Sequence, residues 1–166
     1  DDWVRSRIGA PFDRDGALAA RGKIDESALK ILLSDDYFSV PPPKSLDRNT
    51  FSSAALATLS DEDGAATLVA FTAQAVALGL SLCPAGTQRL LVTGGGRHNP
   101  CLLAALAERT GIPVEPVETV GWRGDALEAE AFAYLAVRSL NGAVLSLPET
   151  TGVRQPQCGG VLYRAG

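Results

Sequence analysis

The stretch of the sequence best suited to chemistry is Val92-Thr93-Gly94-Gly95-Gly96-Arg97-His98-Asn99-Pro100. A short apolar run precedes three successive glycines, and a proline that can begin a helix follows them. Glycines let a backbone approach a ligand closely, and free N–H groups at the start of a helix favour an anion. The pattern therefore favours a bound nucleotide. The alternative is a tight strand-to-helix turn that binds nothing.

This stretch lacks the common phosphate-binding motifs. The turn contains no Lys, as a Walker A loop requires, and its glycines are not spaced as G-x-G-x-x-G. Arg97 is placed to meet a phosphate or to stack on a base. His98, the one histidine, is either a solvated or capping side chain or a catalytic base.

A second feature is a carboxylate in the predicted helix 125–140. At 100° per residue, Glu128 falls between Phe132 and Leu135, inside the apolar arc of a helix that is apolar nearly all round. The sequence therefore predicts a buried helix. Glu128 and Asp125 either complement the positive helix N-terminus or belong to a site.

Other reactive side chains are scattered. Arg14, Lys44 and Arg48 lie in predicted loops and are generic partners for a phosphate or an acidic ligand. The three cysteines, at positions 83, 101 and 158, form no C-x-x-C pair and have no visible base partner. This spacing favours neither a zinc site nor a disulfide framework nor a cysteine nucleophile, and it is typical of a reducing compartment.

Helices and strands must position these residues. The sequence predicts helices over 1–8, 26–33 with Asp25 as cap, 50–59, 61–82 after Ser60, 101–109 and 125–140, and strands over 89–93 and 114–117. Residues 1–88 are thus mainly helical, 89–142 form a strand–helix–strand–helix unit, and 143–166 are irregular, with a short strand at 161–163 left open. A strand, a crossover helix and a second strand imply a parallel pair and an α/β fold.

Composition sets limits on the class of protein. The chain has 166 residues, of which 46% are hydrophobic and 20% charged, enough for one domain or one and a part. Lys and Arg total 15 and Asp and Glu total 19, giving a net charge of −4. A mildly acidic chain does not favour nucleic acid or an anionic membrane as partner. One histidine excludes a multi-histidine metal centre, and no metal site is predicted.

The chain contains no Met and starts inside a helix-like segment, so we interpret it as a piece of a longer protein. The rival interpretation is a complete small protein that lost its Met. Two parallel strands make a poor sheet alone, which favours further strands upstream of Asp1. The longest apolar stretch, 65–84, is interrupted by polar residues, and we expect a core helix there and no membrane span.

Several short motifs then occur in a specific order. These are Pro11-Phe12-Asp13-Arg14-Asp15-Gly16-Ala17, Pro41-Pro42-Pro43-Lys44-Ser45, Ala66-Thr67-Leu68 with Phe71-Thr72-Ala73, Gly94-Gly95-Gly96 with Asn99-Pro100, Glu128-Ala129 with Ala131-Phe132-Ala133, and Thr150-Thr151-Gly152. The set resembles the C-terminal part of the anhydro-N-acetylmuramic acid kinase family, over essentially the whole chain.

The resemblance implies an actin-like ATPase sugar kinase fold with two ribonuclease-H-like domains around a cleft, of which this helix-rich chain is part. It implies a cytoplasmic bacterial enzyme of cell-wall recycling. That enzyme hydrates 1,6-anhydro-N-acetylmuramic acid and phosphorylates it with ATP and Mg²⁺, yielding N-acetylmuramic acid 6-phosphate. The family's catalytic aspartate lies in an Asp-Thr-Gly-Pro motif expected upstream of Asp1, so the isolated chain should be inactive. The partners implied are the missing N-terminal half and the amino sugar, with a homodimer left open.

The resemblance also assigns residues. Gly94, Gly95 and Gly96 match the adenosine-proximal loop, with Asn99 following, and Glu128 matches a cleft-facing glutamate on the substrate side. Arg97-His98 stands where much of the family has Ala-Arg, and Leu46-Asp47-Arg48-Asn49 replaces Thr-Gly-Arg-Glu after Lys44-Ser45. Two alternatives stay open: a catalytically silent nucleotide-binding or assembly module, and another member of the actin-like superfamily.

Overall fold

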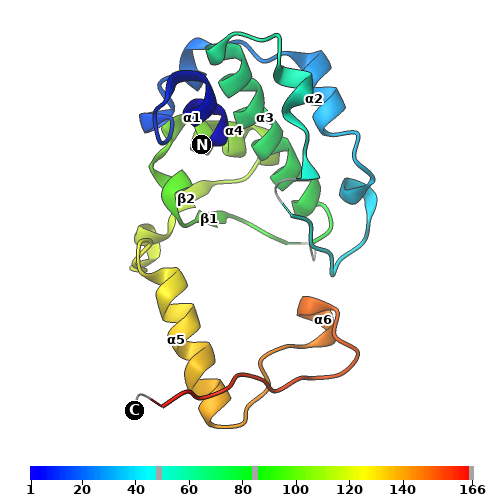
Figure 1. Cartoon of the computed structure of the whole chain (residues 1–166), viewed down its shortest axis with the longest axis vertical. Coiled ribbons are helices and arrows are strands. Elements are labelled where there is room, and N and C mark those ends of the chain that lie inside the picture. Colours follow the sequence, from blue (N-terminus) through cyan, green and yellow to red (C-terminus); the bar gives the residue numbers. More distant parts are fainter. Residues whose placement is uncertain (48–49, 84–85, 165–166) are drawn as a thin grey trace.

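A computed structural model describes residues 1–47, 50–83 and 86–164 of the chain. A body of helices covers a small sheet, and α5 leads away from it towards the C-terminal segment (Figure 1). The elements are α1 (Asp2–Ile8), α2 (Glu26–Leu32), α3 (Asp61–Leu80), β1 (Leu90–Val92), α4 (Pro100–Thr110), β2 (Val114–Pro116), α5 (Leu127–Leu140) and α6 (Pro148–Thr151).

Side chains at the helix starts explain why the helices begin where they do. Asp25 Oδ1 accepts the backbone N–H of Ala28 at 2.8 Å, and Ser60 Oγ accepts that of Asp63 at 3.0 Å. Each contact satisfies an N–H that has no partner within its helix. Gly9 and Gly111 end α1 and α4 in the left-handed conformation that glycine adopts without strain. These helix boundaries confirm the sequence prediction to within a few residues.

The long helix α3 is the centre of the body. Small side chains along it are buried, among them Ala66, Ala70 and Ala73, and α1, α2 and α4 pack around it. Trp3 of α1 lies against Gly64 and donates a hydrogen bond from Nε1 to the carbonyl of Asp61 at 2.9 Å. By length and composition alone α3 could cross a membrane, which corrects the sequence expectation that no segment could. In this fold it serves as a core helix.

The predicted helix over residues 50–59 is wrong. A short 3₁₀ turn, Ser53–Leu56, forms there instead, and Ser52 Oγ accepts the backbone N–H of Ala54 at 3.2 Å. A serine that bonds its own neighbouring backbone competes with helix formation. The turn carries Leu56 into a fully buried position against Ala28 and Leu32 of α2.

The sheet is the predicted parallel pair. β1 and β2 lie side by side with Leu90 opposite Val114 and Val92 opposite Pro116, and α4 forms the crossover. Residues at the carboxyl ends of parallel strands meet at one edge of the sheet. The glycine stretch follows β1 at this edge, and the turn Val117–Val120 follows β2.

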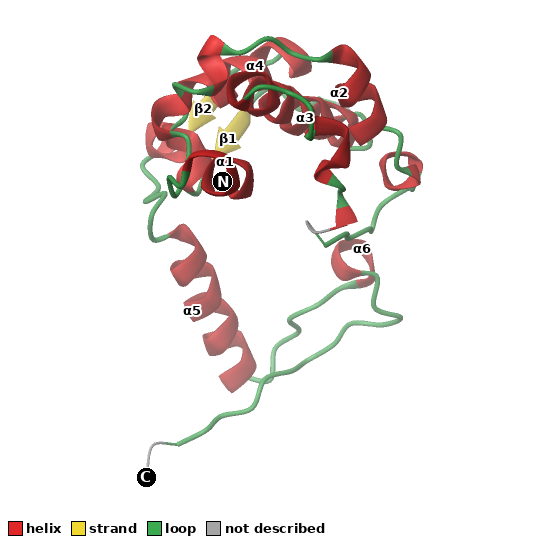
Figure 2. Ribbon diagram, turned by 45° about the horizontal axis from the view of Figure 1, so that its top comes forward, coloured by secondary structure: helices red, strands yellow, loops and turns green. Residues whose placement is uncertain are grey.

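The prediction that the helix at 125–140 is buried is wrong for this chain. None of the described residues of α5 is buried, and Phe132, Tyr134 and Val137 are 66%, 60% and 56% exposed. Figure 2 shows α5 standing apart from the helical body. An apolar helix is buried only where other elements cover it. Among the described residues, the C-terminal segment contacts α5 at Arg138 and Ser139 but buries none of its side chains.

The C-terminal segment is more ordered than predicted. α6 forms within it, and Ser146 pairs with Gln157 in an isolated antiparallel bridge. The strand left open at 161–163 does not form.

Candidate functional site

A cavity of about 560 Å³ opens beside the glycine stretch. We define the glycine loop as Gly94–His98, and one wall consists of its residues Gly95, Gly96 and His98 together with Asn99 at the start of α4. The facing wall is the turn Phe12–Asp15, which lies far away in the sequence. The structure therefore brings the glycine loop together with a segment in which the sequence had singled out only Arg14 as a generic ligand partner.

The backbone of the glycine loop is open towards its surroundings. Gly94 has a φ of 72°, in the left-handed region that favours glycine. A Cβ placed on Gly94 or Gly95 would meet no protein atom within 4 Å, whereas one on Gly96 would lie 3.2 Å from Leu102 Cδ2. No other part of the fold therefore fills the space beside Gly94 and Gly95. A ligand needs this space to approach the backbone of the loop.

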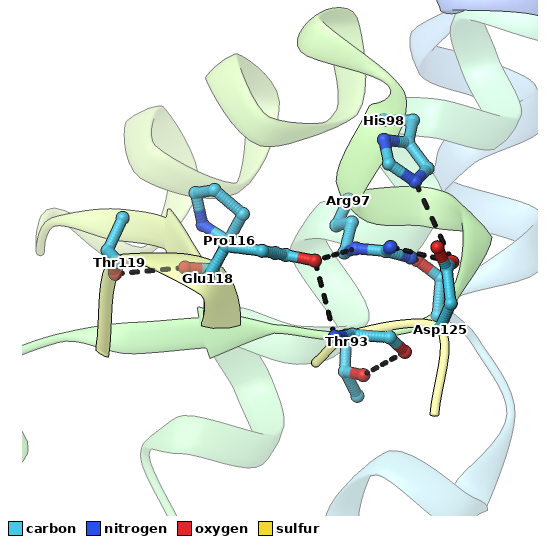
Figure 3. Close-up of polar contacts among 9 residues, drawn as sticks. Thr93, Arg97, His98, Pro116, Glu118, Thr119 and Asp125 are labelled. Atoms are coloured by element: carbon cyan, nitrogen blue, oxygen red, sulfur yellow. Dashed lines mark hydrogen bonds and ion pairs between the residues drawn. The ribbon is translucent and has the colours of Figure 1, made fainter. Parts of the chain in front are cut away.

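The structure corrects the role expected for the side chain of Arg97. The guanidinium is buried and donates from Nε to Glu118 Oε1 at 2.8 Å, from Nη2 to Asp125 Oδ1 at 2.6 Å and from Nη1 to the carbonyl of Gly94 at 2.9 Å. Figure 3 shows it held between the two carboxylates. All three nitrogens have protein partners, so this side chain is not presented to a phosphate or a base.

The cluster is charged at neutral pH. The hydrogen bond to Asp125 raises the pKa of Arg97, and the same bond lowers the pKa of Asp125. The pKa of Glu118 is lowered first by a hydrogen bond from its own backbone N–H and then by that from Arg97. Sequence reasoning missed Glu118, whereas for Asp125 it left open a role at the helix terminus or in a site.

His98 and Asn99 also line the cavity. His98 is exposed, with its Nε2 atom 4.0 Å from Asp125 Oδ1, which agrees with the solvated alternative. Asn99 Oδ1 caps α4 by accepting the backbone N–H of Leu102 at 3.0 Å. A Cβ on Gly16 would collide with that same side chain, so the turn 12–15 is packed closely against the start of α4.

Local contacts fix the facing wall. Asp13 accepts the backbone N–H groups of Leu18 and Ala19 at 2.8 and 3.0 Å. The guanidinium of Arg14 lies over the ring of Phe12, which is 47% exposed, at 5.6 Å from its centroid. Asp15 adopts a φ of 56°, unusual for a residue other than glycine. Sequence analysis singled out Arg14 as a generic ligand partner, but it could not predict that residues 12–15 face the glycine loop, because the two segments are far apart in the chain.

The cavity suits the uncharged part of a nucleotide better than its phosphates. Its aromatic ring and open backbone can accept a base, and carboxylates can accept ribose hydroxyl groups. The carboxylates of Asp13 and Asp15 on the same wall would repel a triphosphate.

The other predicted residues lie elsewhere. Glu128 is exposed in the first turn of α5 and does not line this cavity. Lys44 donates from Nζ to the carbonyl of Tyr37 at 2.6 Å and lies over the Tyr37 ring, so it holds its own loop together. Arg48 falls outside the described residues. Within the described part of the chain, no three His, Cys, Asp or Glu side chains gather as a metal site needs.

Comparisons with known proteins agree with this arrangement of motifs. Residues 1–165 match the sequence profile of the family described as anhydro-N-acetylmuramic acid kinase. Curated proteins of that name from Rhizorhabdus wittichii, Acidiphilium cryptum and Rhodospirillum rubrum are 54%, 56% and 54% identical over 99%, 100% and 99% of this chain. The matches cover 45%, 47% and 44% of those proteins, so the chain spans about half their length. The chain belongs to the anhydro-N-acetylmuramic acid kinase family.

Proposed function

We propose that the full-length protein uses ATP to convert 1,6-anhydro-N-acetylmuramic acid into N-acetylmuramic acid 6-phosphate, in the cytoplasm and as part of cell-wall recycling. Support comes from the family match over residues 1–165 and from relatives of that name that are more than half identical. Because the chain spans about half the length of these relatives, the activity is proposed for the whole protein.

We further propose that this chain supplies the nucleotide side of an actin-like fold. The observation that carries the proposal is the glycine loop, which opens without a covering side chain onto a cavity of about 560 Å³. Gly94, Gly95 and Gly96 would offer their backbone to the adenosine of ATP, with Asn99 beside them. Phe12, on the facing wall, would contact the base.

The proposed reaction balances with water as nucleophile. Water attacks the anomeric carbon, the bond from that carbon to O6 breaks, and O6 takes the γ-phosphoryl group of ATP, leaving ADP. The proton of the water needs a base within hydrogen-bond reach. We assign that base to the aspartate of the Asp-Thr-Gly-Pro motif, expected upstream of Asp1. Mg²⁺ would accompany the phosphates of ATP, and we assign it no ligand in this chain.

Glu128 is proposed as a substrate-side residue. It is exposed at the start of α5, close in sequence to the ion pair that joins this helix to the glycine loop. An exposed carboxylate there can accept a sugar hydroxyl across a cleft.

The test uses the purified full-length protein with ATP, Mg²⁺ and the anhydro sugar. We expect stoichiometric ADP and a phosphorylated sugar that is heavier than the substrate by one water and one phosphoryl group (HPO₃). Residues 1–166 alone should give neither product, because they lack the proposed base. If the full-length protein binds ATP but forms no product, the chain is instead part of a catalytically silent module. Turnover by the isolated chain would contradict the placement of the base.

A further inference from the structure

The ion-pair cluster joins Arg97 to Glu118 and Asp125, which stand 21 and 28 residues further along the chain. Arg97 belongs to the glycine loop, Glu118 to the 3₁₀ turn Val117–Val120 after β2, and Asp125 to the turn ahead of α5. Figure 3 shows the guanidinium between the two carboxylates, at the edge of the sheet where both strands end.

The side chain of Arg97 is more deeply buried than the side chains of its two partners. Its side chain is 3% exposed, whereas those of Glu118 and Asp125 are 46% and 87% exposed. An arginine whose planar guanidinium donates hydrogen bonds to several acceptors at once fixes the orientation of each acceptor. Asp125 therefore keeps a mostly solvated carboxylate at a fixed distance from the glycine loop.

Gly124 strengthens the connection. Its N–H donates to Glu118 Oε1 at 3.2 Å, and its carbonyl accepts from Thr93 Oγ1 at 3.3 Å. A Cβ on Gly124 would lie 2.6 Å from Glu118 Oε1 and 2.7 Å from Arg97 Cζ. The turn ahead of α5 is thus packed directly onto the cluster and bonded to Thr93, which lies between β1 and the glycine loop.

The rest of α5 has no comparable anchor among the described residues. None of its side chains is buried, and the helix leads away from the body in both views (Figures 1 and 2). Its orientation relative to the glycine loop is therefore set at its first turn. Glu128 stands three residues after Asp125, on that turn.

We propose that Arg97, Glu118 and Asp125 form a positioning cluster. This cluster fixes the orientation of the first turn of α5, the proposed substrate side, relative to the glycine loop. The inference rests on the proposed function. Nucleotide binding at the glycine loop then favours the orientation of α5 that accepts the sugar, so the two ligands bind cooperatively. By linkage, each ligand raises the affinity of the other by the same factor.

The test compares matched variants of the full-length protein. Asp125→Ala removes the acceptor at the start of α5, and Asp125→Asn keeps an oxygen there. Glu130→Ala is the control, because Glu130 lies on the same helix and pairs with the exposed Arg123 outside the cluster. We expect Asp125→Ala to lower kcat/KM for the sugar by about tenfold or more and to raise KM for ATP, measured with saturating sugar, by about fivefold or more. Asp125→Asn and Glu130→Ala should stay within about threefold of the wild type.

A binding measurement on the wild type gives a second, independent readout. The dissociation constant of a nonhydrolysable ATP analogue should fall by about fivefold or more when the sugar is present, and this change should disappear in Asp125→Ala. Absence of wild-type turnover would overturn the proposed function. Normal turnover with equal analogue affinity in the presence and absence of sugar would overturn only this inference. So would Asp125→Ala kinetics that match the control.

Discussion

Gly95 allows a direct test of the nucleotide site with one substitution. A Cβ at this position would meet no protein atom within 4 Å, so Gly95→Val should fold and fill only the space proposed for the ligand. We expect ATP affinity in the full-length protein to fall by at least about tenfold, or about 1.4 kcal/mol. Calorimetric titration with ATP measures this.

Gly79→Val is the matched control. Gly79 also has open space around its Cβ, but it lies in α3, away from the cavity. The control should bind ATP like the wild type. Unchanged affinity in a folded Gly95→Val variant would mean that the glycines form a turn that binds nothing.

Substitution of Glu128 distinguishes a role in the substrate site from a role in stabilising the N-terminus of α5. As a charge near the start of α5 it is worth about 0.3–1 kcal/mol of stability, and Glu128→Gln would then leave activity intact. We expect instead a loss of about tenfold or more in kcat/KM, with little change in Tm. Steady-state kinetics and a thermal melt on one preparation measure both, with Glu130→Gln as control. Wild-type kcat/KM in Glu128→Gln would rule out the site role.

The acid response of the cluster follows from the pKa shift of Asp125. Its native pKa lies below the unfolded value of about 3.9, because Arg97 donates a hydrogen bond to the charged form. Such a group stabilises the fold above the unfolded pKa, and this stabilisation is lost as the pH falls through the native pKa. We expect Asp125→Asn to lower Tm slightly at neutral pH. The difference from the wild type should shrink below about pH 4. A difference that stays constant into stronger acid would mean that the charge of Asp125 does not stabilise the fold.

At the scale of elements, the sequence predicted helix ends well where a single capping or terminating residue determines them. The caps Asp25 and Ser60 and the terminating Gly111 mark helix ends through contacts a few residues away. The parallel pair also follows from local order, because a short strand, a helix and a second strand leave little choice of topology.

The cluster around Arg97 could not be predicted in the same way. Its partners Glu118 and Asp125 stand 21 and 28 residues further along the chain, and the fold alone brings them together. The apolar character of α5 predicted burial, which this chain does not show. The elements that would cover the helix are not among the described residues.

α5 gives the element-scale prediction. We expect its apolar face to be covered in the full-length protein by the part that the relatives have and this chain lacks. Large exposed apolar surface on a helix marks an interaction site. Amide hydrogen exchange of peptides from 127–140 should be slow in the full-length protein and fast in residues 1–166 alone. Equal exchange in both would contradict this packing.

At the scale of the whole molecule, we propose that this chain and the upstream part of the protein each contribute to one reaction. This chain would hold the nucleotide between the glycine loop and residues 12–15, and the upstream part would supply the catalytic aspartate. The cavity between these two segments has the lining that a nucleoside requires.

Photolabelling tests the central claim, that ATP binds in the cavity at the glycine loop, most directly. The full-length protein is irradiated with 8-azido-ATP, and the labelled peptides are identified by mass spectrometry, with excess ATP as competitor. The account predicts label on peptides that contain residues 12–15 or 95–99, lost when ATP is added. ATP-protected label found only elsewhere in the protein would contradict it.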